Sequence, residues 1–462
     1  MSISRSNLLK WALVIILPAC CFLIPLSDIY TPQVRWFFVI TVCGLTMAAF
    51  EVVRLGVIGA LMPAFWYLLN VAPLPVIMSP YTTSVMYMSI GAFVFAAAAE
   101  QSGLLKRISF WILAKVNGNY WALLYGIFFT GAILTLLTFG MMSHIIMAAL
   151  CLGMCKALKI LDTKFSAVIA MAVMLGTCAS HCFVYNASAY AVIGSLAGGL
   201  INMRELGINA LTVTLHNWPM MIVCMFTLWV IGKWYYENRT LESKSYFETQ
   251  LKEMGPIKKN EKAVGVVMAL MLLFLFTQSW HKMDCNLIFM LLPWALFLPG
   301  IDSADADTIK AVNWEMLLFF AACMSIGMIA GNMGLGQVIV QFVTPILAAN
   351  GGSLSIIVGT VFGVIFGLNF LLTPTAIWAL ITQPLLQIAQ ALGISALPMV
   401  YALVHCSEAI IFPYEYVPYL LVFSFGMISM KDFIKMSVVR CIIYALGLML
   451  FLIPYWKLIG IA

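Results

Sequence analysis

Residues His405–Tyr419 read HCSEAIIFPYEYVPY, and the fold depends on how this stretch is interpreted. It places two glutamates and two prolines inside a long apolar segment. Proline removes a backbone donor and breaks a helix, and a charged side chain is costly within a bilayer. The pattern therefore predicts a helix that is interrupted inside the membrane, with its freed backbone groups lining a cavity.

The composition supports a membrane location. The chain has 462 residues, of which 63% are hydrophobic and 9% are charged, so it lacks the polar surface of a soluble domain. Apolar runs of roughly 17–25 residues recur along its length, as spanning helices require. We predict an all-α polytopic membrane protein. The net charge of +6 indicates contact with anionic lipid rather than nucleic acid.

The apolar runs predict about eleven spans and two re-entrant hairpins, the hairpins at 119–154 and 352–392. The spans are expected near 11–28, 35–50, 55–72, 84–101, 163–200, 213–232, 263–280, 286–300, 313–333, 395–426 and 438–456. In this topology all but four of the 24 lysines and arginines lie in segments on one side, and Arg440 is among the majority. The positive-inside rule then places the N-terminus in the cytoplasm and the C-terminus outside the cell membrane.

The two hairpin regions resemble each other in layout. Each has an apolar span, a Gly-Leu pair, a helical piece, a turn and then the hairpin, with similar spacing from Gly103 to Ser143 and from Gly334 to Thr375. In the predicted topology one hairpin starts inside and the other outside. Such inverted repeats with interrupted helices are typical of secondary transporters that follow an alternating-access mechanism.

Four helix breaks are predicted, two at hairpin tips and two in broken spans: Gly140–His144, Gly176–Asn186, Asn369–Thr375 and Pro413–Pro418. Helix N-termini suit an anion, whereas unwound carbonyls and hydroxyls suit Na⁺. The alternative for any single hydroxyl is a bond back to its own helix.

Four segments, in order, resemble the divalent anion/sodium symporter family, which carries di- and tricarboxylates and sulfate within the ion transporter superfamily. They read FEVVRLGVIGALMPAFW, SPYTTSVMYMSIGAFVFAAAAEQSGLLKRIS, NWEMLLFFAA and PYEYVPYLLVFSFGMISMKD. The last is similar to the family pattern P-V-A-T-P-P-N-A-I-V-F-x-x-G-x-I-x-x-x-D. The likeness covers nearly the whole chain.

The resemblance implies an elevator-type homodimer. It implies a scaffold from 1–118 and 263–345, a transport domain from 119–232 and 346–462, and a cytoplasmic linker at 233–262. The family's Ser-Asn-Thr triplets at the hairpin tips fall on Met141-Met142-Ser143 and Thr373-Pro374-Thr375, so neither asparagine is present.

The candidate site residues follow from the breaks and from the resemblance. Substrate contacts are expected from Met142, Ser143, Gly176, Thr177, Thr373, Pro374, Thr375, Tyr416 and Pro418. Ion coupling is expected from Glu415, Glu408, His144, His181, Gly140 and Asn369. Na⁺ is the candidate coupling ion, near Gly140, Ser143 and Gly176 in one half and near Thr373 and Thr375 in the other; no other cofactor is expected.

Glu415 departs most from the family pattern. A protonated Glu415 can donate a hydrogen bond to a bound anion, which would replace some sodium coupling by proton coupling. An acidic pocket that binds a cation or zwitterion is the alternative. For Glu408, which follows His405 by three residues, the alternative is a structural pair with that histidine.

These features predict a secondary active transporter for a small anion, such as a dicarboxylate or a sulfate-like ion, coupled to Na⁺ or H⁺. The expected partners are the anion, membrane lipids and a second copy of the chain. A proton-coupled or exchange carrier of a zwitterion or cation is the main alternative, followed by an ion channel. No nucleophile–base pair in the sequence indicates an enzyme.

Overall fold

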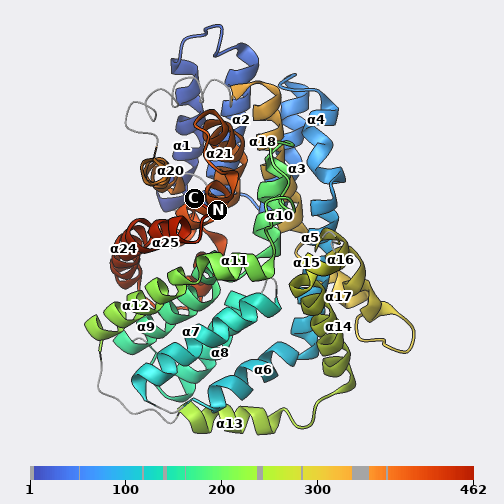
Figure 1. The fold of residues 1–462 in the computed structure, drawn as a ribbon, viewed down its shortest axis with the longest axis vertical. Helices are drawn as coiled ribbons and strands as arrows, with labels where there is room; N and C mark the ends of the chain where they lie inside the picture. The colour runs from blue at the N-terminus through green and yellow to red at the C-terminus, as the bar shows by residue number, and fades with distance from the viewer. Residues whose placement is uncertain are drawn as a thin grey trace.

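The computed structural model describes residues 5–50, 52–116, 119–138, 143–161, 163–236, 243–281, 283, 285–335, 353–370 and 373–462. Within these residues the chain is helical and contains no strand (Figure 1). Helices satisfy their backbone groups internally, which suits an apolar chain in lipid. The prediction of an all-α architecture with many apolar helices is confirmed.

The first half of the chain is a series of helices separated by short connections. Its α-helices are α1 (Arg5–Ala19), α2 (Pro32–Ala49), α3 (Leu55–Leu68), α4 (Leu74–Met78), α5 (Ser84–Ser102), α6 (Leu104–Ala114), α7 (Tyr120–Leu137), α8 (Ser143–Ala157), α9 (Lys164–Thr177), α10 (Ala187–Leu196), α11 (Ala210–Asn217) and α12 (Pro219–Trp234). Short 3₁₀ turns lie between some of them: η1 (Cys20–Leu23), η2 (Ser79–Thr82) and η3 (Ala179–Cys182).

The second half continues in the same way. Its α-helices are α13 (Ser243–Glu253), α14 (Lys259–Phe276), α15 (Gln278–His281), α16 (Cys285–Leu291), α17 (Ala306–Lys310), α18 (Trp314–Asn332), α20 (Leu354–Asn369), α21 (Pro374–Ala391), α22 (Ala396–Cys406), α23 (Val417–Ser424), α24 (Met430–Gly447) and α25 (Ile453–Leu458). The shorter turns are η4 (Leu292–Phe297), η5 (Pro413–Glu415) and the π-helical η6 (Leu448–Leu452).

By length and composition, five of the described helices can cross a membrane, or six if the bent pair α11 and α12 forms one span. Further apolar helices of 10–17 residues, among them α3, α8 and α20, are shorter. The segment predicted as one span at 213–232 is bent by 55° where α11 meets α12, because Pro219 begins the second helix.

Helix α9 is buried within the lower part of the molecule. Every residue from Phe165 to Thr177 is buried, and α7, α8 and α12 pack around this helix (Figure 1). A Cβ atom on Gly176 would lie 2.5 Å from the carbonyl oxygen of Phe128 in α7. A residue without a side chain therefore lets the two helices approach closely.

The same succession of elements occurs twice. A helical pair, α7 with α8, precedes a helix that is interrupted at η3 before α10. Later in the chain α20 and α21 precede α22, which is interrupted at η5 before α23. Both predicted broken spans are thus interrupted helices, and each break coincides with the Gly-, Pro- and polar-rich stretch that predicted it.

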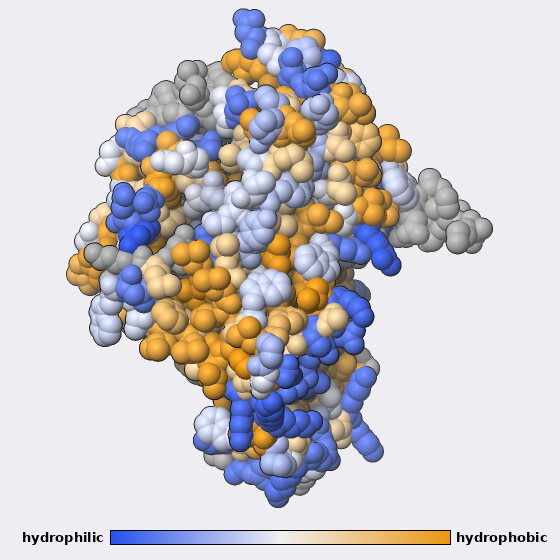
Figure 2. All heavy atoms as spheres, turned by 90° about the vertical axis from the view of Figure 1, so that its right-hand side faces the viewer, coloured by the Kyte–Doolittle hydropathy of each residue, from blue (hydrophilic) through white to orange (hydrophobic). Residues whose placement is uncertain are grey.

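The surface has a polar end. Figure 2 shows hydrophilic residues gathered at the lower end of the molecule and hydrophobic residues over much of the face above it. Helix α13, rich in lysine and glutamate, lies at this end in Figure 1. Arg107 of α6 holds the segment after α13 through hydrogen bonds to Glu261 and to the carbonyl oxygen of Gly255.

The predicted placement of Arg440 in a loop is wrong. The continuous helix from Met430 to Leu458 is 29 residues long and contains Arg440, whose side chain is fully buried. Hydropathy assigned the start of this helix to a loop because it carries two lysines and this arginine. The burial of Arg440 is possible because it pairs with Glu408, which lies on another segment.

Candidate functional site

A cavity of about 310 Å³ lies among the described residues at the meeting point of the two repeats. Four predicted site residues line it: His144, Thr375, Tyr416 and Pro418. Residues of α5 and α18 complete the wall, among them Ser89 and Phe320. The cavity thus collects elements from both hairpins, both broken spans and two further helices.

Helices begin at the wall of this cavity. Lining residues lie in or just before the first turns of α8, α10, α18, α21 and α23; they are His144, Ser188, Asn313, Thr375 and Pro418. The N-terminus of a helix carries partial positive charge and unpaired N–H groups. Asn186 and Asn313 each accept one of these N–H groups as a cap. The convergence of five helix starts creates an electrostatic environment that favours an anion.

The lining side chains are neutral or weakly basic. Among the described lining residues none is aspartate, glutamate, lysine or arginine, and His144 is the histidine. Hydroxyl and amide groups come from Ser188, Asn313 and Thr375. Hydrogen-bond donors without an opposing carboxylate can contact an anion without repelling it.

Oxygen atoms cluster beneath the first hairpin tip. Thr135 Oγ1 lies 3.0 Å from Ser143 Oγ and 3.2 Å from the carbonyl oxygen of Thr177. All three residues are buried. The Thr177 hydroxyl itself donates back to the Val173 carbonyl oxygen, so its carbonyl, and not its hydroxyl, faces the hairpin. Such a set of hard oxygen atoms has the chemistry that Na⁺ prefers.

The second hairpin tip carries buried oxygen atoms as well. Asn369 donates from Nδ2 to the carbonyl oxygen of Ala409, 3.0 Å away, which ties the hairpin to the second broken span. Asn369 Oδ1 and Thr373 Oγ1 have no hydrogen-bond partner among the residues that the structure describes. These two atoms are candidate ligands for a cation.

A buried ionic cluster connects the two broken spans. Glu408 accepts hydrogen bonds from Arg440 (3.2 Å) and Tyr419 (2.8 Å), and its other oxygen lies 3.1 Å from His181 Nε2. The side chains of Glu408 and Arg440 are at most 1% exposed. Arg440 also donates to the carbonyl oxygen of Ile410, in the unwound part of the second span. A charged pair this deep requires such partners, although Arg440 Nε has none among the residues that the structure describes.

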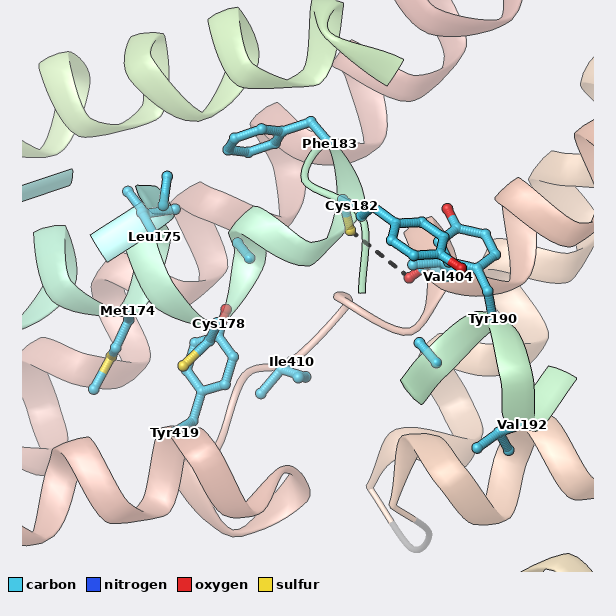
Figure 3. Close-up of a cluster of buried hydrophobic side chains, with 14 of the residues drawn as sticks. Met174, Leu175, Cys178, Cys182, Phe183, Tyr190, Val192, Val404, Ile410 and Tyr419 are labelled. Carbon is cyan, nitrogen blue, oxygen red and sulfur yellow. Dashed lines mark hydrogen bonds between the residues drawn. The ribbon is translucent and has the colours of Figure 1, made fainter. Parts of the chain in front are cut away.

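Figure 3 shows how the two breaks meet. Cys178 of the first broken span lies beside Tyr419 and Ile410 of the second. The Cys182 thiol approaches the carbonyl oxygen of Val404 at 3.9 Å. The two interrupted helices thus pack directly against each other, which brings His181 to Glu408.

Tyr416 links the cluster to the cavity. It lines the cavity, and its ring centroid lies 6.2 Å from that of His181 and 5.9 Å from that of Tyr419. One aromatic ring therefore separates the cavity from the ionic cluster.

Two other predicted groups are engaged elsewhere. His405 lies 2.8 Å from Tyr444 Oη and 2.9 Å from Asn217 Oδ1, and Glu408 pairs with Arg440 rather than with this histidine. Glu415 is buried outside the cavity lining and accepts hydrogen bonds from the backbone N–H groups of Ile411 and Phe412.

The structure therefore brings some candidates to one cavity and distributes others around it. Ser143, Gly176, Thr177, Thr373, Pro374 and Asn369 support the hairpin tips and the first break, whereas Gly140 and Met142 lie outside the described residues. Sequence reasoning missed Arg440, Thr135 and Asn313. Only Arg440 carried a signal, as a charge near an apolar run.

Comparison with known proteins gives a family match over most of the chain. A family model described as a citrate transporter matches residues 38–405. Among curated proteins no relative matches the sequence. Among solved structures, the crystal structure of the Alcanivorax borkumensis YdaH transporter is similar, with 15% sequence identity, coverage of 99% of each chain and a TM-score of 0.47.

Proposed function

Since the chain belongs to the citrate transporter family, we propose that it is a secondary active transporter of small multivalent anions, with di- and tricarboxylates as the first substrates to test. The family match confirms the resemblance to di- and tricarboxylate carriers of the ion transporter superfamily. The family is one of membrane transporters rather than enzymes.

The observation that carries the anion proposal is the cavity at which five helices begin. The partial charges of those helices stabilise a carboxylate or sulfate group, and Ser188, Asn313 and Thr375 supply neutral polar contacts. The absence of acidic side chains from the described lining disfavours a cationic substrate.

We propose Na⁺ as one coupling ion. The Ser143–Thr135–Thr177 oxygen cluster and the buried oxygens of Asn369 and Thr373 supply hard ligands at the two hairpin tips. Each tip lies beside residues that line the cavity, His144 on one side and Thr375 on the other. An ion at either tip would draw these oxygen atoms together and so fix the positions of the residues that contact the substrate.

The elevator mechanism and the homodimer are further parts of the proposal, with a scaffold at 1–118 and 263–345 and a transport domain at 119–232 and 346–462. The cavity supports this division. Ser89, Phe93, Asn313 and Met316 on its wall come from the scaffold, whereas His144, Ser188, Thr375 and Tyr416 come from the transport domain. A site at this boundary can change its exposure when one unit slides along the other.

The test is uptake of radiolabelled citrate, succinate and sulfate by proteoliposomes that contain the purified protein. Na⁺ and H⁺ gradients are imposed separately, with protein-free liposomes as the control. We expect gradient-driven accumulation of at least one anion, inhibited by the others. Failure of every anion to accumulate, to exchange or to compete, while the protein remains folded, would reject the anion proposal.

A further inference from the structure

The side of the cavity that belongs to the proposed scaffold is mostly apolar. Along α5, Ser89, Phe93 and Ala97 recur at every fourth position, so they lie on one face of that helix. Met316 and Phe320 have the same spacing along α18. The Ser89 hydroxyl donates back to a carbonyl oxygen of its own helix and is therefore already engaged. Most of this wall can thus contact only an apolar group.

The opposite wall, from the proposed transport domain, carries the free polar groups. Ser188, Thr375 and Tyr416 line the cavity, and none of their hydroxyls forms a hydrogen bond with a residue that the structure describes. His144 beside them is 6% exposed and also has no hydrogen-bond partner among the described residues. Buried polar groups normally have partners, so this set indicates a ligand that hydrogen-bonds to one wall only.

The charge of the polar wall matches about two carboxylates. Four helices of the proposed transport domain, α8, α10, α21 and α23, begin there. Each helix start carries roughly half a positive charge, so the four together offset about two negative charges. The described lining contains no lysine or arginine, and the hairpin sequences FGMM (139–142) and LL (371–372) contain none either. A third carboxylate would therefore lack a counter-charge.

The size of the cavity also favours a small ligand. Its volume of about 310 Å³ is at the lower end of ligand-binding cavities. When the carboxylates of a succinate-sized anion lie against the polar wall, a substituent on its carbon chain faces Phe93 and Phe320. A hydroxyl group in that position would lose its hydrogen bonds to water, whereas a methyl group would gain from burial.

We propose that the cavity selects dicarboxylates with an apolar substituent, such as methylsuccinate, over hydroxylated anions such as malate and citrate. Phe93, Met316 and Phe320 contact the substituent and are the specificity-determining residues. The inference rests on the proposed anion transport and names the substrate class of the same cavity. Recognition is divided between the two units, because the proposed transport domain binds the carboxylates and the proposed scaffold selects the substituent.

The first experiment compares methylsuccinate with malate, which has a hydroxyl group in place of the methyl group. The two anions have the same charge when fully ionised and nearly the same size, so the helix starts contribute equally to both. Calorimetric titration of the purified protein, with Na⁺ present throughout, gives both dissociation constants. We expect methylsuccinate to bind at least about tenfold more tightly. Equal binding, or tighter binding of malate, would overturn the inference.

Variants of the apolar wall locate the selection. Phe320→Ala removes a ring from the wall and should reduce the preference for methylsuccinate to about threefold or less, with succinate binding little changed. Leu318→Ala, on the same helix but 39% exposed and outside the described lining, is the matched control and should keep the full preference.

Phe93→Ala in α5 should act as Phe320→Ala does, and it replaces that variant if the latter does not fold. The readout is a ratio of two affinities of the same protein, so a general loss of stability does not change it. A preference that stays at the wild-type value in both phenylalanine variants would overturn the assignment of specificity to this wall.

The outcomes separate the inference from the function on which it rests. Binding of succinate, malate or citrate without a preference for methylsuccinate would overturn the inference and leave anion transport intact. Failure of methylsuccinate, malate, succinate, citrate and sulfate all to bind the folded wild-type protein would instead reject the proposed function itself.

Discussion

The two broken spans use polar residues differently, although they occupy equivalent places in the repeat. The first is interrupted by the short turn η3, and Asn186 then caps α10 through Ala189. The second unwinds over a longer stretch, where the Glu415 carboxylate accepts hydrogen bonds from the backbone N–H groups of Ile411 and Phe412. Its other glutamate, Glu408, instead pairs with Arg440 and with His181 of the first span.

The difference separates two roles for a buried charge. Glu415 compensates locally for a backbone that two prolines have interrupted. Glu408 joins segments that are distant in sequence, and one of its partners is titratable. In the sequence, Glu408 and Glu415 look alike, since each is a glutamate within an apolar segment. Only their partners in the structure distinguish the two roles.

The largest expected effect comes from removing Arg440, the permanently charged member of the buried ionic cluster. Arg440→Leu leaves Glu408 buried without its guanidinium partner, which should destabilise the protein by about 3–5 kcal/mol. Thermal unfolding in detergent should show a large fall in midpoint. Lys435→Leu, on the exposed side of the same helix, is the control and should unfold as wild type does.

The Arg440 prediction can be sharpened with a double variant. Glu408→Leu combined with Arg440→Leu removes both charges and should unfold at a higher temperature than Arg440→Leu alone. Equal unfolding of Arg440→Leu and wild type would show that the Glu408–Arg440 pair does not stabilise the packing of α24 against the second broken span.

The next effect concerns the first broken span alone. Gly176→Ala places a Cβ atom against the Phe128 backbone, and we expect a loss of about 1–3 kcal/mol in stability together with reduced uptake. Gly363→Ala in α20 meets open space and is the control. Unchanged thermal unfolding of Gly176→Ala would contradict the close contact between α7 and α9.

Binding effects should be similar in the two halves. Ser188→Ala in α10 and Thr375→Val in α21 each remove a hydroxyl from the cavity wall, and each should raise the half-saturation constant for citrate uptake by roughly three- to tenfold. Thr382→Val, farther along α21 and bonded to the Trp378 carbonyl oxygen, should leave uptake unchanged. An effect of only one of the first two variants would show that substrate contacts one half.

The smallest effect is expected at His405. His405→Gln can preserve part of the contact with Asn217 and Tyr444, so stability should fall by about 1 kcal/mol. The pH profile of citrate uptake should match that of wild type. A changed profile would show that this histidine takes part in proton binding.

The interruptions could be predicted from sequence because their signals are local. Glycine, proline and polar residues mark both breaks. Helix α9 ends at Thr177, inside the predicted break Gly176–Asn186, whereas α22 already ends at Cys406, ahead of the predicted break Pro413–Pro418. The placement of His144, Thr375 and Tyr416 on one cavity also followed from the repeat and from the family pattern.

The partners across the structure could not be predicted in the same way. Thr135 and Asn313 lie in or beside ordinary helices. Only tertiary packing brings Thr135 to the Thr177 carbonyl oxygen and Asn313 to the cavity wall. Arg440 was misplaced because a hydropathy window counts its charge but cannot see Glu408 beside it. Glu415 drew attention as a charge, although its carboxylate serves the adjacent backbone.

The buried arginine also bears on how the chain enters the bilayer during synthesis. An arginine at the centre of a helix raises the free energy of insertion by about 2.5–3.5 kcal/mol when the helix enters alone. Its carboxylate partner lies 32 residues earlier and leaves the ribosome first. We therefore expect α22 to α24 to partition into lipid as one cooperative unit, so that truncation before Arg440 leaves the preceding segment poorly inserted.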